Sequence, residues 1–287
     1  MNRSSDVIEF LANNDNPDQL ILAPNAPPVC RSAGAIDVAF GRVYDAQDVN
    51  DTLAAFRTRA LAASREPELQ LSGSFSFGVR DVGRFRVNYA TQRGSRVLTV
   101  VRIPFKIPAL ADLATDEADV RRALAVLTAD APGLVSIGGP SSVANATLAY
   151  GLLAEMNRTL RSVLFMLERT TTFLLSHENS LSVQCELHTD VPTMEEGIRT
   201  AVLFEPDVLY VGDVQGDDLL PDVPRLVANG VNTIVSSVVV DESALIERFA
   251  PAATGGALGA LQCAAFHVRP AEAGKLHVTS SARRKEI

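Results

Sequence analysis

The pattern of apolar residues changes at the segment Ile103-Pro104-Phe105-Lys106-Ile107-Pro108. Before it, apolar residues alternate with polar ones in short runs. After it, they form near-continuous runs separated by helical patterns. The two prolines can continue neither a strand ladder nor a helix, so the segment reads as an extended connector. We therefore predict two domains, residues 1–105 and 117–287, joined by a linker at 106–116.

The first domain is predicted to be α+β. Two-residue periodicity marks strands at residues 20–22, 36–40, 71–77, 83–88 and 97–101, and one helical pattern covers residues 48–63. Glycine and asparagine separate the strand patterns, which is typical of antiparallel connections. The expected architecture is an antiparallel sheet with a helix on one face.

The second domain is predicted to be α/β with a largely parallel sheet. Apolar runs at residues 133–137, 162–167, 207–211 and 232–235 are typical of strands covered on both faces. Amphipathic helices fit between them at 145–160 and at 193–204, where Thr193 and Glu196 form a capping-box pattern. Strand and helix in alternation favour parallel crossovers.

Composition argues against several functions. The formal net charge of -8 disfavours nucleic-acid binding, which needs clustered cations. The short basic run Arg283, Arg284, Lys285 is interpreted as a solvated tail. No apolar stretch approaches the roughly 20 residues that cross a bilayer, and the N-terminus lacks a signal-peptide core. We expect a cytoplasmic protein with no membrane insertion.

The cysteines do not indicate a metal centre. Cys30, Cys185 and Cys263 lie far apart, without a C-x-x-C spacing or a nearby histidine pattern. They are interpreted as buried, reduced thiols, and no metal site is predicted.

A degenerate phosphate-binding loop lies between the first buried strand of the second domain and its helix. Its residues are Gly139, Pro140, Ser141, Ser142, Val143, Ala144, Asn145, Ala146 and Thr147. A working loop needs glycines whose amides surround the phosphates, a lysine, and a hydroxyl for magnesium. Here the lysine position holds Asn145 and the hydroxyl position holds Ala146. With Ala144 where a glycine would permit positive φ, we expect a conformation collapsed or displaced from a phosphate cradle.

The sequence around this loop resembles the hexameric motor ATPases that retract type IV pili, as in twitching motility, and drive type II secretion. The resemblance rests on Phe75-Ser76-Phe77, on Gly83 to Asn88, on Arg102-Ile103-Pro104, on Gln184, Glu186, His188 and Asp190, on Arg199, and on Pro206 to Asp213. These matches keep their order and spacing over most of residues 18–250. The resemblance implies a PAS-like N-terminal domain followed by a RecA-like domain with the fold of P-loop NTPases.

Departures from the family pattern concentrate where its chemistry would lie. The acidic box of the family appears as Glu168 followed by Arg169 and three threonines, and both histidines of its histidine box are replaced at residues 229–231 and 237–239. The residue in place of the Walker B glutamate is Asp213, which is one methylene shorter. The candidate catalytic remnants are therefore Asp213, Glu168, Glu186 and His188.

These remnants support two interpretations. They can be a surviving active site, or they can preserve interface contacts and core hydrogen bonds inherited with the fold. The same holds for the arginines Arg86, Arg102 and Arg199. In the family, arginines of the N-terminal domain approach nucleotide, and without nucleotide Arg86 and Arg102 could instead pair with Asp213 or Glu168.

The leading hypothesis is a pseudo-ATPase that acts as a scaffold or regulator of a type IV pilus or type II secretion motor. The resemblance implies self-association or association with an active motor ring, and contact with an inner-membrane platform protein, which would place the chain in the cytoplasm or peripherally at that membrane. No cofactor is expected. The alternative is a divergent ATPase that uses ATP and magnesium, with Asp213 as the base and a cation recruited from Arg169, Arg86 or a partner subunit.

Overall fold

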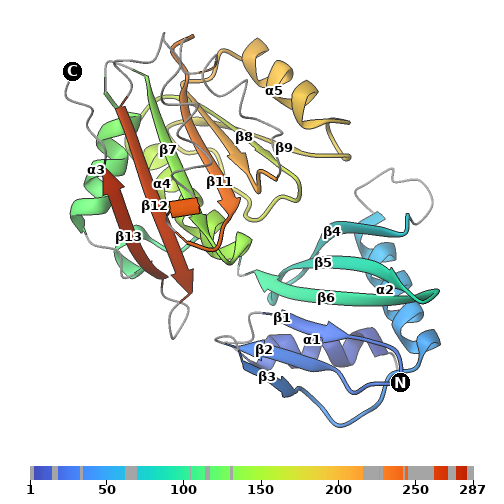
Figure 1. Ribbon diagram of the computed structural model, residues 1–287. Coiled ribbons are helices and arrows are strands. Elements are labelled where there is room, and N and C mark those ends of the chain that lie inside the picture. The colour runs from blue at the N-terminus through green and yellow to red at the C-terminus, as the bar shows by residue number, and fades with distance from the viewer. Residues whose placement is uncertain are drawn as a thin grey trace. The chain divides into compact units, whose positions relative to one another are not determined.

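The computed structural model describes residues 3–14, 19–32, 35–61, 70–103, 105–113, 117–129, 132–215, 226, 229–241, 243–244, 262–270 and 276–282. The chain divides into two compact units, Met1–Lys106 and Ile107–Ile287 (Figure 1). Each unit has its own sheet. The basic run Arg283 to Lys285 and the connector residue Pro104 lie outside the described residues.

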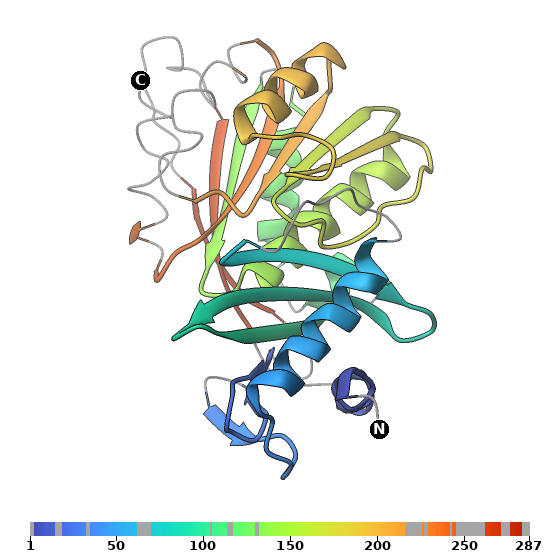
Figure 2. The ribbon, with the colours of Figure 1, turned by 90° about the vertical axis from the view of Figure 1, so that its right-hand side faces the viewer.

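The first unit is an antiparallel six-stranded sheet with helices on one face. The sheet order is β3-β2-β1-β6-β5-β4. The strands are β1 (Gln19–Leu22), β2 (Val29–Ser32), β3 (Ala35–Val38), β4 (Ser72–Val79), β5 (Gly83–Gln92) and β6 (Ser95–Ile103). The helices α1 (Arg3–Asn13) and α2 (Ala46–Leu61) lie behind the strands in Figure 1. Figure 2 shows α2 from the side and α1 along its axis.

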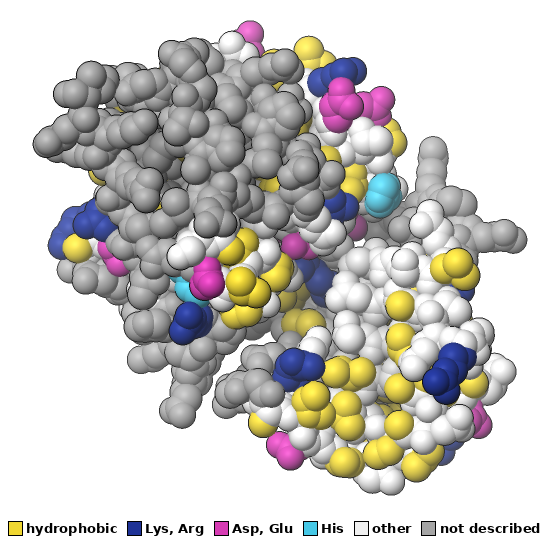
Figure 3. Space-filling model, in the orientation of Figure 1, with side chains coloured by type: hydrophobic (Ala, Val, Ile, Leu, Met, Phe, Trp, Pro, Cys, Tyr) yellow, Lys and Arg dark blue, Asp and Glu magenta, His cyan; other side chains and the backbone are white. Residues whose placement is uncertain are grey.

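Strand alternation places the core of this unit between the sheet and its helices. Along β5, Phe85, Val87 and Tyr89 are buried, whereas Asn88 between them is exposed. Phe77 stacks against both Phe85 and the α2 residue Phe56, at ring-centroid distances of 5.4 and 5.0 Å. The opposite face has no helix over it in the described part of the chain, and Figure 3 shows apolar side chains scattered over it among uncharged atoms and a few charged side chains.

Two elements of this unit were not predicted. Helix α1 buries Ser4, Val7 and Leu11, which recur at helical spacing, so its amphipathic pattern was a signal that the sequence analysis did not use. Strand β2 is a half-buried tetrapeptide paired on both sides by β1 and β3. The strand is therefore defined by its neighbours more than by its own sequence. The strand expected at residues 36–40 is β3, and it ends at Val38.

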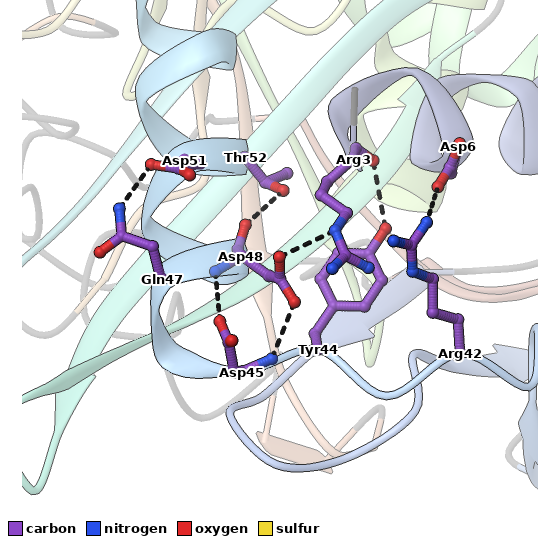
Figure 4. Close-up of polar contacts among 9 residues, drawn as sticks. All are labelled: Arg3, Asp6, Arg42, Tyr44, Asp45, Gln47, Asp48, Asp51 and Thr52. Carbon is purple, nitrogen blue, oxygen red and sulfur yellow. Dashed lines mark hydrogen bonds and ion pairs between the residues drawn. The ribbon is translucent and has the colours of Figure 1, made fainter. Parts of the chain in front are cut away.

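Polar contacts attach α1 to the start of α2 (Figure 4). The Arg3 guanidinium pairs with Asp48 at 2.8 Å and lies 5.3 Å from the centre of the Tyr44 ring. The Tyr44 hydroxyl donates a hydrogen bond to the Arg3 carbonyl at 3.1 Å. Arg42 adds a longer pair with Asp6 at 3.7 Å. These contacts join segments that are distant in sequence, and the fully buried Tyr44 ring is at their centre.

Arg102 caps the C-terminal end of α1. From β6, its Nη1 donates to the carbonyls of Leu11 and Ala12 at 3.2 and 3.4 Å, and its Nε donates to the Val82 carbonyl at 3.1 Å. The last carbonyls of a helix lack intrahelical partners and form the negative end of its dipole, so a guanidinium is favourable there. Arg102 thus has a structural role within the first unit.

The second unit is built on a seven-stranded sheet. The strands are β7 (Gly133–Gly139), β8 (Val163–Glu168), β9 (Leu181–Glu186), β10 (Val208–Gly212), β11 (Asn232–Val238), β12 (Gln262–Pro270) and β13 (Leu276–Ala282), in the order β13-β12-β7-β11-β10-β8-β9. Every pairing is parallel except that of β12 with β13. The prediction of an α/β unit with a largely parallel sheet is confirmed.

Helices cover both faces of this sheet (Figure 2). Helix α5 (Met194–Leu203) contacts β8, and its Ile198 belongs to the same buried cluster as Phe165 and Leu167 of that strand. Helices α3 (Glu117–Leu127) and α4 (Ser142–Thr159) lie on the other face. No helix in the described ranges is long and apolar enough to span a membrane.

The segment expected to be an extended linker contains ordered structure. A 3₁₀ helix, η1 (Leu110–Leu113), lies within residues 106–116 and buries Leu113. Leu110 packs against Gly151 of α4. Leu113 is buried and Leu110 is partly buried, so this part of the segment packs on α4.

We predict that stability falls at alkaline pH because of Tyr44. Burial, with a contribution from Asp6, raises the pKa of Tyr44 from 10.0 to about 12. Above pH 10 the unfolded phenol ionises while the folded one stays protonated, so its contribution is complete below pH 10 and is lost as pH rises through about 12. At about 1.4 kcal/mol per pKa unit, the loss is roughly 2–3 kcal/mol.

Urea unfolding of the wild type and of Tyr44→Phe at pH 9 and pH 11.5 tests this. The phenylalanine variant has no phenol to ionise and should lose less stability over this range. Equal losses in the two proteins would contradict the assignment.

Candidate functional site

The candidate site lies at the carboxyl edge of the seven-stranded sheet. Parallel pairing places Glu168 opposite both Glu186 and Gly212, and Gly139 opposite Val238. The carboxyl ends of parallel strands meet at one edge, which is where open α/β sheets bind ligands. The sequence-predicted residues Glu168, Glu186, Asp213 and the loop after Gly139 are therefore brought to a common edge.

The loop after β7 is only two residues long. β7 ends at Gly139 and α4 begins at Ser142, three residues before the predicted start. Ser141 is the N-cap of α4, and its Oγ accepts the Ala144 amide at 3.3 Å. The Ser141 carbonyl accepts the Asn145 amide at 3.0 Å. The Ala144 and Asn145 amides are thus used by the helix itself.

The glycine at position 139 has a packing role. A Cβ there would lie 1.9 Å from the Val268 carbonyl oxygen of the adjacent strand β12. No side chain fits at that distance, so Gly139 is required by the close approach of two strands, whether or not a phosphate binds.

Asn145, which the sequence analysis predicted to stand in place of a phosphate-binding lysine, points back into the sheet edge. It is 1% exposed. Its Nδ2 donates to the Gly139 carbonyl at 3.3 Å and to the Ser237 carbonyl at 3.0 Å. Its Oδ1 is buried without a hydrogen-bond partner. The side chain therefore joins the ends of β7 and β11 through α4.

The Glu168 carboxylate is buried among groups that donate to it. Oε2 accepts the Tyr150 hydroxyl at 2.6 Å and the Thr172 amide at 3.1 Å, and Oε1 accepts the Thr172 hydroxyl at 2.9 Å. Burial, and then the charge of Glu168, raise the pKa of Tyr150 well above its usual value. The phenol therefore stays protonated and continues to donate, and both carboxylate oxygens have a partner.

Two residues of β9 hold the segment that follows Glu168. The Gln184 side chain accepts the Leu175 amide and donates to the Phe173 carbonyl, both at 2.8 Å. The Glu186 Oε2 accepts the Thr171 amide at 2.7 Å. The side chains of Gln184 and Glu186, which belong to the motif-like stretch in the sequence, therefore form hydrogen bonds with backbone groups of residues 171–175.

Asp213 follows β10 in a left-handed backbone conformation, with φ of 56°. Its amide donates to Ser236 Oγ at 3.1 Å, and its carbonyl accepts Arg169 Nε at 3.3 Å. A non-glycine residue in this region is uncommon, and several contacts fix it here. In the described part of the chain its carboxylate accepts no hydrogen bond, unlike that of Glu168.

His188 and Arg199 of the second unit make none of the side-chain contacts described above. His188 is exposed, with φ of 66°, in the turn after β9. Arg199 is exposed on α5 and pairs with Glu195 at 2.6 Å. Arg86 is buried on β5 and Arg102 caps α1, both in the first unit. The hydrogen bonds of Arg102 described above go to backbone carbonyls of that unit.

Sequence reasoning missed the partners that define the site. Tyr150 and Ser236 carry polar groups in apolar surroundings, and a buried tyrosine hydroxyl nearly always needs a partner. Tyr150 lies in the predicted helix of the second domain, among apolar residues. Its hydroxyl was therefore a usable signal for a buried polar contact. The identity of its partner, Glu168, depends on the pairing of distant elements.

Metal ligands do not gather in the described residues. No group of three or more histidine, cysteine or acidic side chains there could hold an ion. Cys30 and Cys185 are free thiols, and burial raises the pKa of Cys185.

Sequence comparison connects the chain to pilus ATPases. No family model matches. The type IV pilus retraction ATPase PilT of Pseudomonas aeruginosa is 30% identical over 146 residues, 50% of this chain and 41% of that protein. The type IV pilus ATPase PilU of the same bacterium is 24% identical over 147 residues, 51% and 37% of the two chains. The matches thus span about two fifths of the length of these curated relatives.

Comparison with solved structures finds ATPases of the same kind. A crystal structure of the pilus retraction motor PilT with bound ADP has a TM-score of 0.73 and 21% identity, covering 100% of this chain and 84% of that one. The ATPase DotB of Legionella pneumophila has a TM-score of 0.71 and 16% identity, covering 96% and 79%. The chain has the fold of these ATPases, and its relatives support a relationship to the PilT-like ATPases of pilus and secretion systems.

Proposed function

We propose that this chain is a pseudo-ATPase that acts as a scaffold or regulator of a type IV pilus or type II secretion motor. The observation that carries the proposal is the position of Asn145. Its amide is hydrogen-bonded to the Gly139 and Ser237 carbonyls, where a phosphate-binding loop has a lysine amine. An internal polar contact replaces the contact that the loop would make with nucleotide.

The residues of the loop do not fit the phosphates and magnesium of ATP. A cradle needs free amides, a cation and a hydroxyl ligand. The Ala144 and Asn145 amides are bonded to Ser141, Asn145 carries no charge, and Ala146 has no hydroxyl. Phosphoryl transfer depends almost entirely on positioning and on electrostatic stabilisation of charge, so these losses affect its main source of catalysis.

The acidic remnants also support a structural role. The Glu168 oxygens are bonded to Tyr150 and Thr172, and Glu186 holds the Thr171 amide. Withdrawing either carboxylate from these contacts would leave buried donors unpaired, at a cost of roughly 1–3 kcal/mol each. They are committed to holding the segment after β8.

The proposed scaffold role places this chain in the same kind of machine as its relatives, which are named as type IV pilus ATPases. The proposal assigns a PAS-like domain to the first unit and a degenerate RecA-like domain to the second. It places the protein on the cytoplasmic side, in its own ring or in a ring with an active motor ATPase, and in contact with an inner-membrane platform protein. Surfaces inherited with the fold would make these contacts without nucleotide turnover.

One observation favours a second candidate, a divergent ATPase. Arg169 Nε lies 3.3 Å from the Asp213 carbonyl, so a cation and a carboxylate-bearing residue adjoin at the carboxyl edge. In that case Asp213 would act as the base and Arg169 would supply charge lost with the lysine.

Isothermal titration with magnesium ATP separates the two candidates. The pseudo-ATPase should give no saturable heat at micromolar nucleotide and no phosphate release above a protein-free blank. Saturable micromolar binding together with turnover would overturn the proposal. An Asp213→Asn variant then tests the alternative, because loss of that turnover would assign the base.

Restoring the loop alone should not restore hydrolysis. We expect the triple variant Ala144→Gly, Asn145→Lys, Ala146→Ser to release phosphate at the background rate, although its nucleotide affinity can rise. The acidic box and histidine box remain altered, and catalytic groups that act as a unit recover little when only some are repaired. Turnover near ~1 per second, an ordinary enzymatic value, would show that only the loop was disabled.

A further inference from the structure

We infer that Asn145 is a latch that holds the carboxyl ends of β7 and β11 together in the absence of any ligand. This inference rests on the proposed function, because it describes what replaces nucleotide at that edge. The latch is formed by one side-chain amide and two backbone carbonyls, Gly139 O and Ser237 O.

The geometry of the strand ends shows why a link is needed there. The last ladder pairs of β7 and β11 bring Gly138 opposite Ser237 and Gly139 opposite Val238. Beyond them, the Val239 amide donates to the Gly139 carbonyl at 3.1 Å. Asn145 bonds to that same Gly139 carbonyl and to the Ser237 carbonyl of β11. Its amide therefore links the last paired residues of the two strands.

The latch also connects this edge to β10. Ser237, whose carbonyl accepts Asn145, donates its own hydroxyl to the Val214 carbonyl at 2.8 Å. Ser236 in turn accepts the Asp213 amide. A continuous set of side-chain contacts thus runs from α4 through β11 to the residues after β10.

The orientation of the amide follows from its surroundings. Both neighbours of Nδ2 are carbonyl oxygens, which only the NH₂ group can satisfy. In exchange, Oδ1 is buried without a partner, 3.0 Å from where a Cβ on Gly139 would lie. An unpartnered buried acceptor is unfavourable, so the two donated bonds and the fixed position of α4 account for the residue being held in this pose.

A matched pair of variants tests the latch by hydrogen exchange. Asn157 is also on α4, is also fully buried, and also donates from Nδ2 to a carbonyl, that of Ser176 at 2.7 Å. In Asn145→Ala we expect amide exchange of residues 237–239 to rise by about tenfold or more, the factor for one lost net hydrogen bond. In Asn157→Ala, the increase should fall at residues 176–180 instead.

Asn145→Ser provides a milder variant should alanine prevent folding. Its shorter hydroxyl is not expected to bridge both carbonyls, so exchange at 237–239 should rise, though less than in the alanine variant. Unchanged exchange there in a folded Asn145 variant, or equal increases in the Asn145 and Asn157 variants, would overturn the latch.

Adding magnesium ATP to the wild-type protein separates this inference from the proposed function. The pseudo-ATPase proposal predicts that nucleotide leaves exchange at 237–239 unchanged. Nucleotide-dependent protection there would overturn that proposal, whereas the latch is judged by the Asn145 variants without nucleotide. Unchanged exchange in the Asn145 variants, without a nucleotide effect on the wild type, would overturn the latch alone.

Discussion

The requirement that buried polar groups be paired governs the carboxyl edge of the seven-stranded sheet. At this edge Tyr150 and Thr172 donate to Glu168, and Asn145 donates to the strand ends. Each of these contacts is made within the second unit, and the Asn145 Oδ1 is left buried without a partner.

A shared fold does not by itself fix the chemistry at this edge. The similarity to PilT and DotB concerns the path of the backbone, at 21% and 16% identity. Function has to be judged from the side chains at the site. In this chain Asn145 links the ends of two strands, and a threonine after Glu168 donates to that glutamate. These side chains make structural contacts within the second unit.

In the first unit, the local pattern of apolar residues predicted some elements and missed others. Strands β4, β5 and β6 alternate because one face packs on α2 and no helix in the described residues covers the other, and the sequence predicted all three. Strand β2 lacks such a signal. Helix α1 has helical spacing of its buried residues, and contacts with Tyr44 and Arg102 on two distant segments fix its position.

The sequence by itself predicted the α/β class of the second unit and four of its parallel strands between residues 133 and 238, though not β9. It also predicts a domain division near residue 106 and a loop without the lysine and the hydroxyl. Periodicity and residue type carry that information because burial and backbone chemistry act locally. Tertiary structure decided what the substituted residues do. Whether Asn145 would extend into solvent or turn back, and whether Glu168 would stay available or be enclosed, depends on Ser237, Tyr150 and Thr172 being brought beside them. Those partners lie on other segments of the chain, and only the packing of β7, β8, β11 and α4 sets their distances.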